Sequence, residues 1–251
     1  MLLTADIGNT SITLGLFDEE ALVEEFRLAS DKDLSLEEYE VLLKSLLKDF
    51  NIDGCIISSV VEELTEKFKL AVDNVFKLDA YVLTSEINTG VKILLDNSKE
   101  AGADRIANVV GAYVLYEKPV IVVDFGTATS FDIVNANGEF IGGLIAPGIN
   151  LQLKSLNKFT SKLPRIDATP SNSAIGHNTT DAILSGVIRG TAAMIDGLIE
   201  QCERELGEQA VVVATGGYSG LIANYLRRPF DFINPTLTLE GLRQLYLLNN
   251  V

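Results

Sequence analysis

The chain has 251 residues, 35 of them acidic and 20 basic, so its formal net charge is −15 at pH 7. Because this charge comes with no lysine or arginine run, it excludes a typical nucleic-acid binder and disfavours an anionic membrane surface as a partner. A hydrophobic content of 47% with a charged content of 22% excludes wholesale disorder and predicts a globular protein.

The amino terminus and the cysteines favour a cytoplasmic protein. Asp6 follows closely on Met1 without the basic segment of a signal peptide. The longest candidate for a membrane span is the apolar run 106–116, which is too short to cross a membrane. Cys55 and Cys202 have no metal or redox spacing, which fits a reducing compartment. We therefore expect neither membrane nor nucleic acid among the partners.

The first half of the chain predicts an α/β unit. Residues 3–7 and 12–17 alternate between apolar and polar side chains, which predicts two strands joined by a tight turn at 8–10. Ser35 and Glu38 form a capping-box pair at the start of a helical pattern. The other elements expected in this half are strands at 22–28, 54–61 and 80–83, and helices at 35–50, 64–76 and 104–117.

The second half repeats the opening pattern. Residues 120–127, Val-Ile-Val-Val-Asp-Phe-Gly-Thr, echo Leu-Leu-Thr-Ala-Asp-Ile-Gly-Asn at 2–9, with an offset of 118. One such pattern is common in α/β proteins, but two copies that each open half of the chain indicate an internal duplication. We therefore expect two domains, 1–117 and 118–251. The later elements expected are strands at 128–134, 140–146 and 210–214, a loop at 158–178, and helices at 179–206 and 237–248.

Both repeated turns have the composition of a phosphate-binding loop. At the first, Gly8 lets a phosphate approach the backbone amides, and Asn9, Thr10 and Ser11 add neutral donors. Asp6 would repel a phosphate, so it can act only through Mg²⁺ or its waters. The same logic applies to Asp124 with Gly126 and Thr127 at the second turn. Neither a P-loop string nor a Rossmann glycine string is present.

Residues 102–105, Gly-Ala-Asp-Arg, open an amphipathic helical pattern. The simplest interpretation of Asp104 is a helix cap, because aspartate is favoured there beside the positive end of the helix dipole. A carboxylate next to a substrate hydroxyl is also what phosphoryl transfer requires of its base, and Arg105 supplies a fixed cation. The two roles are compatible.

Small residues recur every three or four positions along the predicted helix 179–206. They are Ala182, Gly186, Gly190, Ala193 and Gly197. Such a stripe allows another backbone to approach closely. Packing against the protein's own sheet and packing against a second subunit are equally compatible with it.

With these motifs located, the sequence resembles the type III pantothenate kinases, which belong to the acetate and sugar kinase, heat-shock chaperone and actin superfamily. The resemblance runs over nearly the whole chain. It rests on the motifs at 6–10, 102–105, 124–127, 142–143, 146–148, 176–179, 215–217 and 237–242. It implies an α/β fold of two ribonuclease-H-like domains, duplicated, with mixed sheets flanked by helices and an ATP cleft between them.

The resemblance also implies a role for each matching residue. The implied ATP-binding residues are Asp6, Gly8, Asn9, Thr10, Ser11, Thr13 and Thr127. The implied pantothenate-binding residues are Gly102, Ala103, Asp104, Arg105 and Thr179, with Asp104 as the catalytic base. Asp6 would organise Mg²⁺, through water, and Asp124 would bind a monovalent cation, K⁺ or NH₄⁺.

Members of this family are typically homodimers, so a homodimer is implied here too. The chain departs from the family pattern at Leu95, where an aromatic residue often stands, and at Ser98, where a proline often stands. The function implied is ATP-dependent phosphorylation of pantothenate to 4′-phosphopantothenate, the first step of coenzyme A biosynthesis. The alternatives are a sugar or acetate kinase of the same superfamily and a non-catalytic nucleotide-binding regulator.

Overall fold

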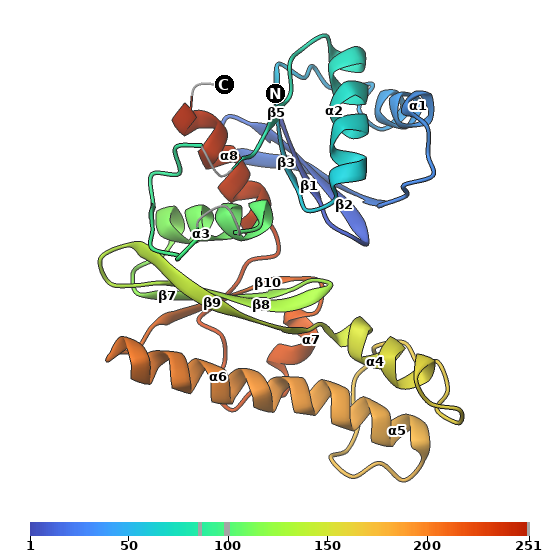
Figure 1. Ribbon diagram of the computed structural model, residues 1–251, viewed down its shortest axis with the longest axis vertical. Coiled ribbons are helices and arrows are strands. Elements are labelled where there is room, and N and C mark those ends of the chain that lie inside the picture. The colour runs from blue at the N-terminus through green and yellow to red at the C-terminus, as the bar shows by residue number, and fades with distance from the viewer. Residues whose placement is uncertain (85–86, 98–100, 250–251) are drawn as a thin grey trace. The chain divides into compact units, whose positions relative to one another are not determined.

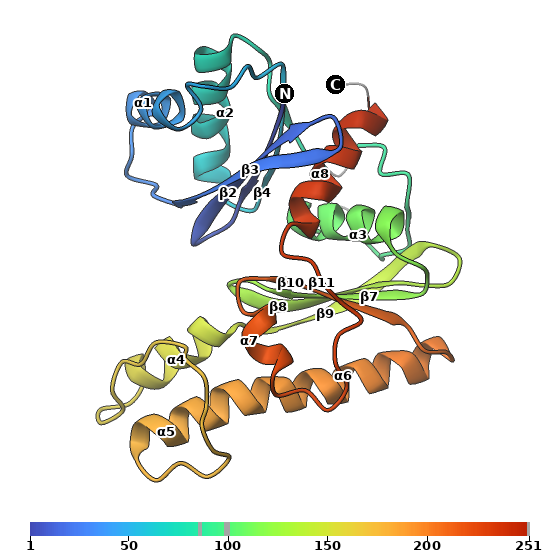
Figure 2. The ribbon, with the colours of Figure 1, turned by 180° about the vertical axis from the view of Figure 1, so that it is seen from behind.

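A computed structural model describes residues 1–84, 87–97 and 101–249 (Figures 1 and 2). The chain forms two compact units, Met1–Val114 with Leu237–Val251, and Leu115–Thr236. The carboxyl-terminal helix therefore belongs with the first unit, although the sequence-based division assigned it to the second domain. The domains 1–117 and 118–251 themselves stay a prediction.

The first unit is built on a mixed sheet with the strand order β3-β2-β1-β4-β5. Its strands are β1 (Leu2–Ile7), β2 (Ser11–Asp18), β3 (Ala21–Ala29), β4 (Gly54–Ser59) and β5 (Tyr81–Val82). A further short strand, β6, covers Lys92–Ile93. The central strand β1 pairs antiparallel with β2 on one side and parallel with β4 on the other.

Helices cover both faces of this sheet. The alternating side chains Leu3, Ala5 and Ile7 form one core with α1 (Leu36–Leu46) and α2 (Glu62–Phe76). On the other face lies α8 (Leu237–Asn249), where Leu239 and Tyr246 occupy the space that side chains at Gly15 and Gly54 would need. Helix α3 (Ala103–Leu115) crosses α8 where Gly111 meets Gly241. The capping box of α1 is confirmed.

The second unit repeats this arrangement. Its strands are β7 (Val120–Phe125), β8 (Ala128–Val134), β9 (Glu139–Pro147), β10 (Val211–Gly216) and β11 (Phe232–Ile233), which run in the order β11-β10-β7-β8-β9. The central strand β7 pairs antiparallel with β8 and parallel with β10, as β1 does with β2 and β4. The predicted class, α/β with mixed sheets flanked by helices, is confirmed.

One face of the second sheet is covered by helices. They are α4 (Ile149–Lys158), α5 (Thr179–Leu184), η2 (Ser185–Arg189), α6 (Gly190–Leu206) and α7 (Ser219–Ala223). Figure 1 shows α6 running along the sheet. The predicted helix 179–206 is continuous, with the π-helical turn η2 in its middle. By length and composition it could cross a membrane, which the sequence analysis did not expect, but half of its apolar window is buried in the core.

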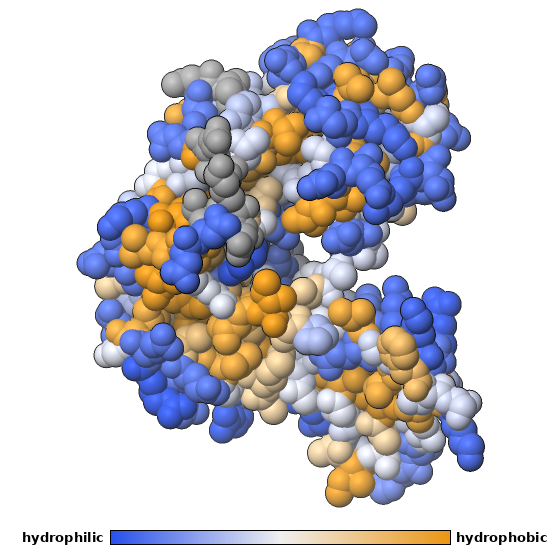
Figure 3. Space-filling view, viewed as in Figure 1, coloured by the Kyte–Doolittle hydropathy of each residue, from blue (hydrophilic) through white to orange (hydrophobic). Residues whose placement is uncertain are grey.

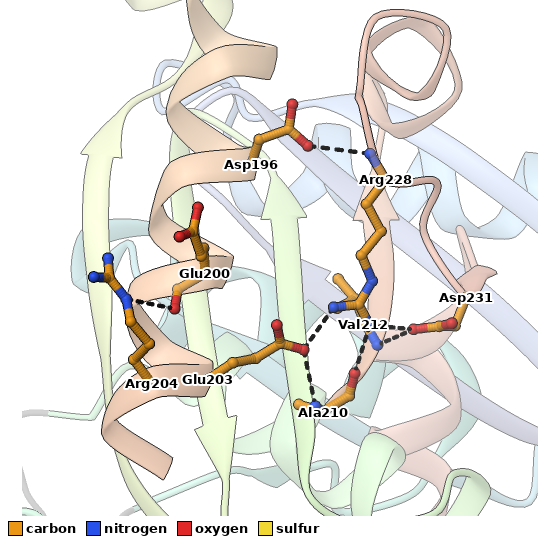
Figure 4. A network of polar contacts seen from close by, with 8 residues as sticks. All are labelled: Asp196, Glu200, Glu203, Arg204, Ala210, Val212, Arg228 and Asp231. Atoms are coloured by element: carbon orange, nitrogen blue, oxygen red, sulfur yellow. Dashed lines mark hydrogen bonds and ion pairs between the residues drawn. The ribbon is translucent and has the colours of Figure 1, made fainter. Parts of the chain in front are cut away.

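A network of charges joins α6 to the start of β10 (Figure 4). The Arg228 guanidinium donates to Glu203 Oε1 at 2.6 Å, to the Ala210 carbonyl at 3.0 Å and to Asp231 Oδ2 at 3.4 Å. The Asp196 side chain, only 6% exposed, accepts from the backbone N–H groups of Arg227 and Arg228. The network fixes the segment between α7 and β11 against α6.

Asp196→Ala is expected to lower the free energy of unfolding by about 2–3 kcal/mol, because it leaves two backbone donors without their charged acceptor. Urea denaturation measures this difference. The matched control is Glu200→Ala on the exposed side of the same helix, which should change stability by less than about 0.5 kcal/mol. Equal losses in the two variants would contradict the assignment.

Candidate functional site

The first hairpin ends in a tight turn, as predicted. The Gly8 N–H donates to the Ser11 carbonyl at 3.0 Å, which leaves Asn9 and Thr10 at the exposed tip. Ser30 holds this turn from the end of β3, because its hydroxyl donates to the Gly8 carbonyl at 2.5 Å and its N–H donates to the Thr10 carbonyl at 3.2 Å. The loop is therefore held in place by backbone and hydroxyl groups.

A row of polar side chains crosses the sheet directly beside this turn. Asp6 on β1 is paired with Thr13 on β2, and Thr13 is paired with Arg27 on β3. Directly paired residues point to the same face of a sheet. The Arg27 guanidinium also donates to Ser11 Oγ at 3.0 Å, so it places a positive charge at the loop. Sequence reasoning missed Arg27, which only the strand register connects to the loop.

The motif at 102–105 forms the start of α3. Gly102 directly precedes the helix, and its carbonyl accepts from the Ile106 N–H at 3.1 Å. Asp104 lies in the first turn, where its Oδ1 accepts from the Arg105 N–H at 2.8 Å. A Cβ at position 102 would lie 2.5 Å from that oxygen, so any other residue there would displace the Asp104 carboxylate. The interpretation of Asp104 as the residue that precedes and caps the helix is therefore wrong, although its carboxylate does accept a first-turn N–H.

The environment of Asp104 changes its acidity. Burial raises the pKa of the carboxyl group above its ordinary value, and the N–H and the positive charge of Arg105 oppose this shift without cancelling it. A carboxylate with a raised pKa is a stronger base than an exposed one. Asp104 is thus suited to accept a proton.

The two motifs of the first unit meet at one edge of its sheet. The Val60 N–H, just after β4, donates to the Ile7 carbonyl at the end of β1 at 3.1 Å. Val60 also lies beside Gly102, with its Cγ1 3.7 Å from where a Cβ of that glycine would be. The carboxyl ends of β1 and β4 and the start of α3 therefore converge, as ligand sites of α/β sheets commonly do.

The second hairpin carries Thr127 next to a helix start. The Gly148 N–H donates to the Thr127 carbonyl at 3.2 Å, and a Cβ on Gly148 would overlap the carbonyl oxygens of Gly126 and Thr127. Helix α4 begins at the next residue, so its positive dipole end lies near the loop. Sequence reasoning did not predict this helix.

Asp124, near the end of β7, lies against a glycine whose positive φ residues with a side chain rarely adopt. Gly216 on β10 has φ +82°, and a Cβ there would lie 2.6 Å from Asp124 Oδ1 and 2.7 Å from backbone atoms of Phe125. This glycine cradle leaves room for the Asp124 carboxylate, whose oxygen atoms can serve as ligands of a cation. Within the described ranges, no three His, Cys, Asp or Glu side chains are grouped so that they could hold a metal ion together.

Thr179 is the first residue of α5 and is exposed. It lines an open groove of about 820 Å³ whose other wall is the second half of α4, including Ser155, Leu156 and Phe159. The structure therefore places Thr179 in this groove, which the second half of α4 lines, whereas the start of α4 lies at the Thr127 loop. Leu95 is half-buried, and Ser98 lies outside the described residues.

The fold defines the class of protein. A crystal structure from Campylobacter jejuni, described as a conserved Baf family transcriptional activator, matches with a TM-score of 0.62 over 99% of this chain and 98% of that one, at 22% identity. MreB 5 of Spiroplasma citri, solved with AMPPNP, matches with a TM-score of 0.54 over 98% and 96% of the two chains, at 12% identity. The chain thus has an actin-like α/β fold, as the resemblance implied.

The sequence comparisons identify the family within that class. The pattern of the family described as type III pantothenate kinase matches residues 2–201. The type III pantothenate kinase of Dehalococcoides mccartyi strain CBDB1 is 44% identical over 100% of this chain and 97% of its own length. That of Thermus thermophilus is 42% identical over 98% and 99%. The chain belongs to the type III pantothenate kinases, and the predicted resemblance is confirmed.

The raised pKa of Asp104 predicts a pH-dependent effect on stability. Because the pKa is higher in the folded protein, the protonated carboxyl group stabilises the fold at low pH, and this contribution is lost as the pH rises through the raised pKa. Asp104→Asn removes this titration. We expect the variant to gain stability relative to the unsubstituted protein as the pH rises above the ordinary aspartate pKa of about 3.9, measured by urea unfolding. A difference that stays constant with pH would contradict the burial of this charge.

Proposed function

We propose that this pantothenate kinase transfers the γ-phosphoryl group of ATP to the primary hydroxyl of pantothenate, giving 4′-phosphopantothenate as the first step of coenzyme A biosynthesis. Membership of the family supports the reaction. The observation that carries the mechanism is the half-buried Asp104 carboxylate, whose pKa is raised, at the edge where the Asp6 loop also ends.

Asp104 acts as the general base. Its carboxylate accepts the proton of the pantothenate hydroxyl while the hydroxyl oxygen forms a bond to the γ-phosphorus and the bond to the β-phosphate oxygen breaks, releasing ADP. The Arg105 N–H holds one carboxylate oxygen at 2.8 Å, so Asp104 is oriented before the substrate binds. Gly102 and Ala103 bring the backbone close to the pantothenate, and the Arg105 guanidinium binds its carboxylate.

ATP is held by neutral donors and by local positive charge. The amides and hydroxyls of the turn at 8–11 bind phosphate oxygens, with Thr13 beside them, and Arg27 adds a charge that the sequence analysis did not assign. Thr127 contacts ATP from the second hairpin, next to the positive end of α4.

The residues present also fit the ions that the family implies. Asp6 ends β1 beside the turn, where its carboxylate would hold Mg²⁺ through water. Asp124 in the Gly216 cradle would hold K⁺ or NH₄⁺. Bound there, these cations neutralise phosphate charge, which lowers the barrier to transfer.

We further propose a homodimer in the cytoplasm. The small-residue stripe does not face the sheet. Gly186 and Gly190 are exposed, and added Cβ atoms there would meet nothing within 4 Å. Figure 3 shows apolar side chains gathered over the neighbouring α4 and α5, where Phe159 is 78% exposed. These exposed faces support a subunit contact that completes the pantothenate pocket near Thr179.

A coupled ADP-release assay tests the reaction. We expect turnover with pantothenate that requires K⁺ or NH₄⁺, and none with glucose, N-acetylglucosamine or acetate. Asp104→Asn should lower kcat about 10²–10⁴-fold while ATP binding persists. In the unsubstituted enzyme, kcat should fall on acidification at a pH above the ordinary aspartate range, in line with the raised pKa. Near-normal turnover of the variant would reject Asp104 as the base, and turnover of a sugar or acetate alone would reject the substrate.

Light scattering at micromolar protein tests the dimer. We expect a dimer mass, and we expect Gly190→Glu to shift it to the monomer because the new charge would be buried at the contact. Gly220→Glu on α7 is the matched control, since a Cβ there also meets nothing within 4 Å. A monomer mass for the unsubstituted protein would refute the proposal.

A further inference from the structure

Ser58 on β4 carries a buried hydroxyl group that has no obvious structural use. Its exposed fraction is 0%, and its Oγ has no hydrogen-bond partner among the residues that the structure describes. A buried hydroxyl without a partner costs roughly 1–3 kcal/mol. An alanine would fill nearly the same space without that cost, so the hydroxyl calls for a use in another state of the protein.

The strand register places this hydroxyl next to Asp6. Ser58 is the residue of β4 paired with Asp6 on the parallel strand β1. Neighbouring strands lie about 4.8 Å apart, and paired side chains point to the same face, so a rotation about the Ser58 side chain can bring Oγ to a carboxylate oxygen. Ser58 thus extends the row of Arg27, Thr13 and Asp6 by one strand.

Ser58 also lies close in the chain to the residue that contacts the start of α3. Two residues after Ser58, Val60 bonds to the end of β1 and contacts Gly102. Ser58 therefore lies on β4, the strand that pairs with β1 at Asp6 and leads to the residue in contact with Gly102. A second buried hydroxyl without a partner, Thr129 Oγ1, differs in this respect. It lies on the face of β8 that carries Phe131 and Ile133 into an apolar core, where no carboxylate is paired with it.

We propose that Ser58 is a positioning residue whose hydroxyl donates a hydrogen bond to the Asp6 carboxylate in the state that binds ATP and magnesium. The proposal rests on the role proposed above for Asp6. Ser58 makes no contact with the reacting atoms. It orients the Asp6 carboxylate when ATP and magnesium bind. In the structure without ligands, its hydroxyl is already in place but has no partner.

The test separates ligand binding from folding by the variant Ser58→Ala. Without ligand, its melting temperature should equal or exceed that of the unsubstituted protein, because an unpartnered buried hydroxyl is removed. Titration calorimetry should show the affinity for ATP with Mg²⁺ reduced about ten-fold, and the affinity for ATP in excess EDTA unchanged. In the activity assay, the Mg²⁺ concentration for half-maximal rate should rise, and kcat at saturating Mg²⁺ should approach the unsubstituted value.

Thr4→Val is the matched control. Thr4 lies on the same face of β1, two residues before Asp6, and its buried hydroxyl donates to the Gly15 carbonyl at 3.2 Å. This variant should lose stability without ligand and keep the Mg²⁺ dependence of ATP binding. If Ser58→Ala binds ATP with Mg²⁺ as tightly as the unsubstituted protein, the role of Ser58 is overturned and the kinase proposal stands. If the unsubstituted protein itself shows no Mg²⁺-dependent ATP binding, both are overturned.

Discussion

The pairing of a central strand with an antiparallel neighbour on one side and a parallel neighbour on the other determines which side chains can act together in each unit. In the first sheet, β1 pairs with β2 and β4, so the register aligns Arg27, Thr13, Asp6 and Ser58 in one row. In the second, β7 pairs with β8 and β10, and the register sets Asp124 beside Thr215, the residue before Gly216. Each central strand thus ends in an aspartate next to a loop of small residues.

Much of this arrangement could be predicted from the sequence. Alternation of apolar side chains identified the hairpin that opens each copy of the duplication, because successive residues of a strand point to opposite faces of its sheet. Register between distant strands could not be predicted, since β4 is separated from β1 by a hairpin and a helix. Ser58 was missed for this reason. Helix α4 was missed because the residue that precedes it, Gly148, offers no side-chain cap.

For the candidate site, the sequence identified the residues but not their roles. The motifs located Asp104, yet the same residues were compatible with a cap and with a base. Packing supplies the support for the proposed base, because burial raises the pKa of Asp104 while Gly102 leaves room for its oxygen. Neither the burial of Asp104 nor the space that Gly102 leaves beside it can be predicted from the neighbouring residues in the sequence. Helix α8 shows the same limit, since its place on the first sheet depends on Gly15 and Gly54, far away in the chain.

A net charge of −15 is compatible with the binding of a polyanion, because distant surface charges are screened whereas groups close to the bound phosphate are not. Surface charges separated by more than about 8–10 Å are largely screened at physiological ionic strength, so the bulk of the acidic residues contributes little at the loops. Within that distance the first loop has the Arg27 guanidinium on Ser11, and the second has the amino end of α4 beside Thr127. The carboxylates that do lie at the strand ends, Asp6 and Asp124, would repel a bare phosphate. The proposed cations would offset this repulsion, so each loop should bind ATP more tightly with its ion than without it.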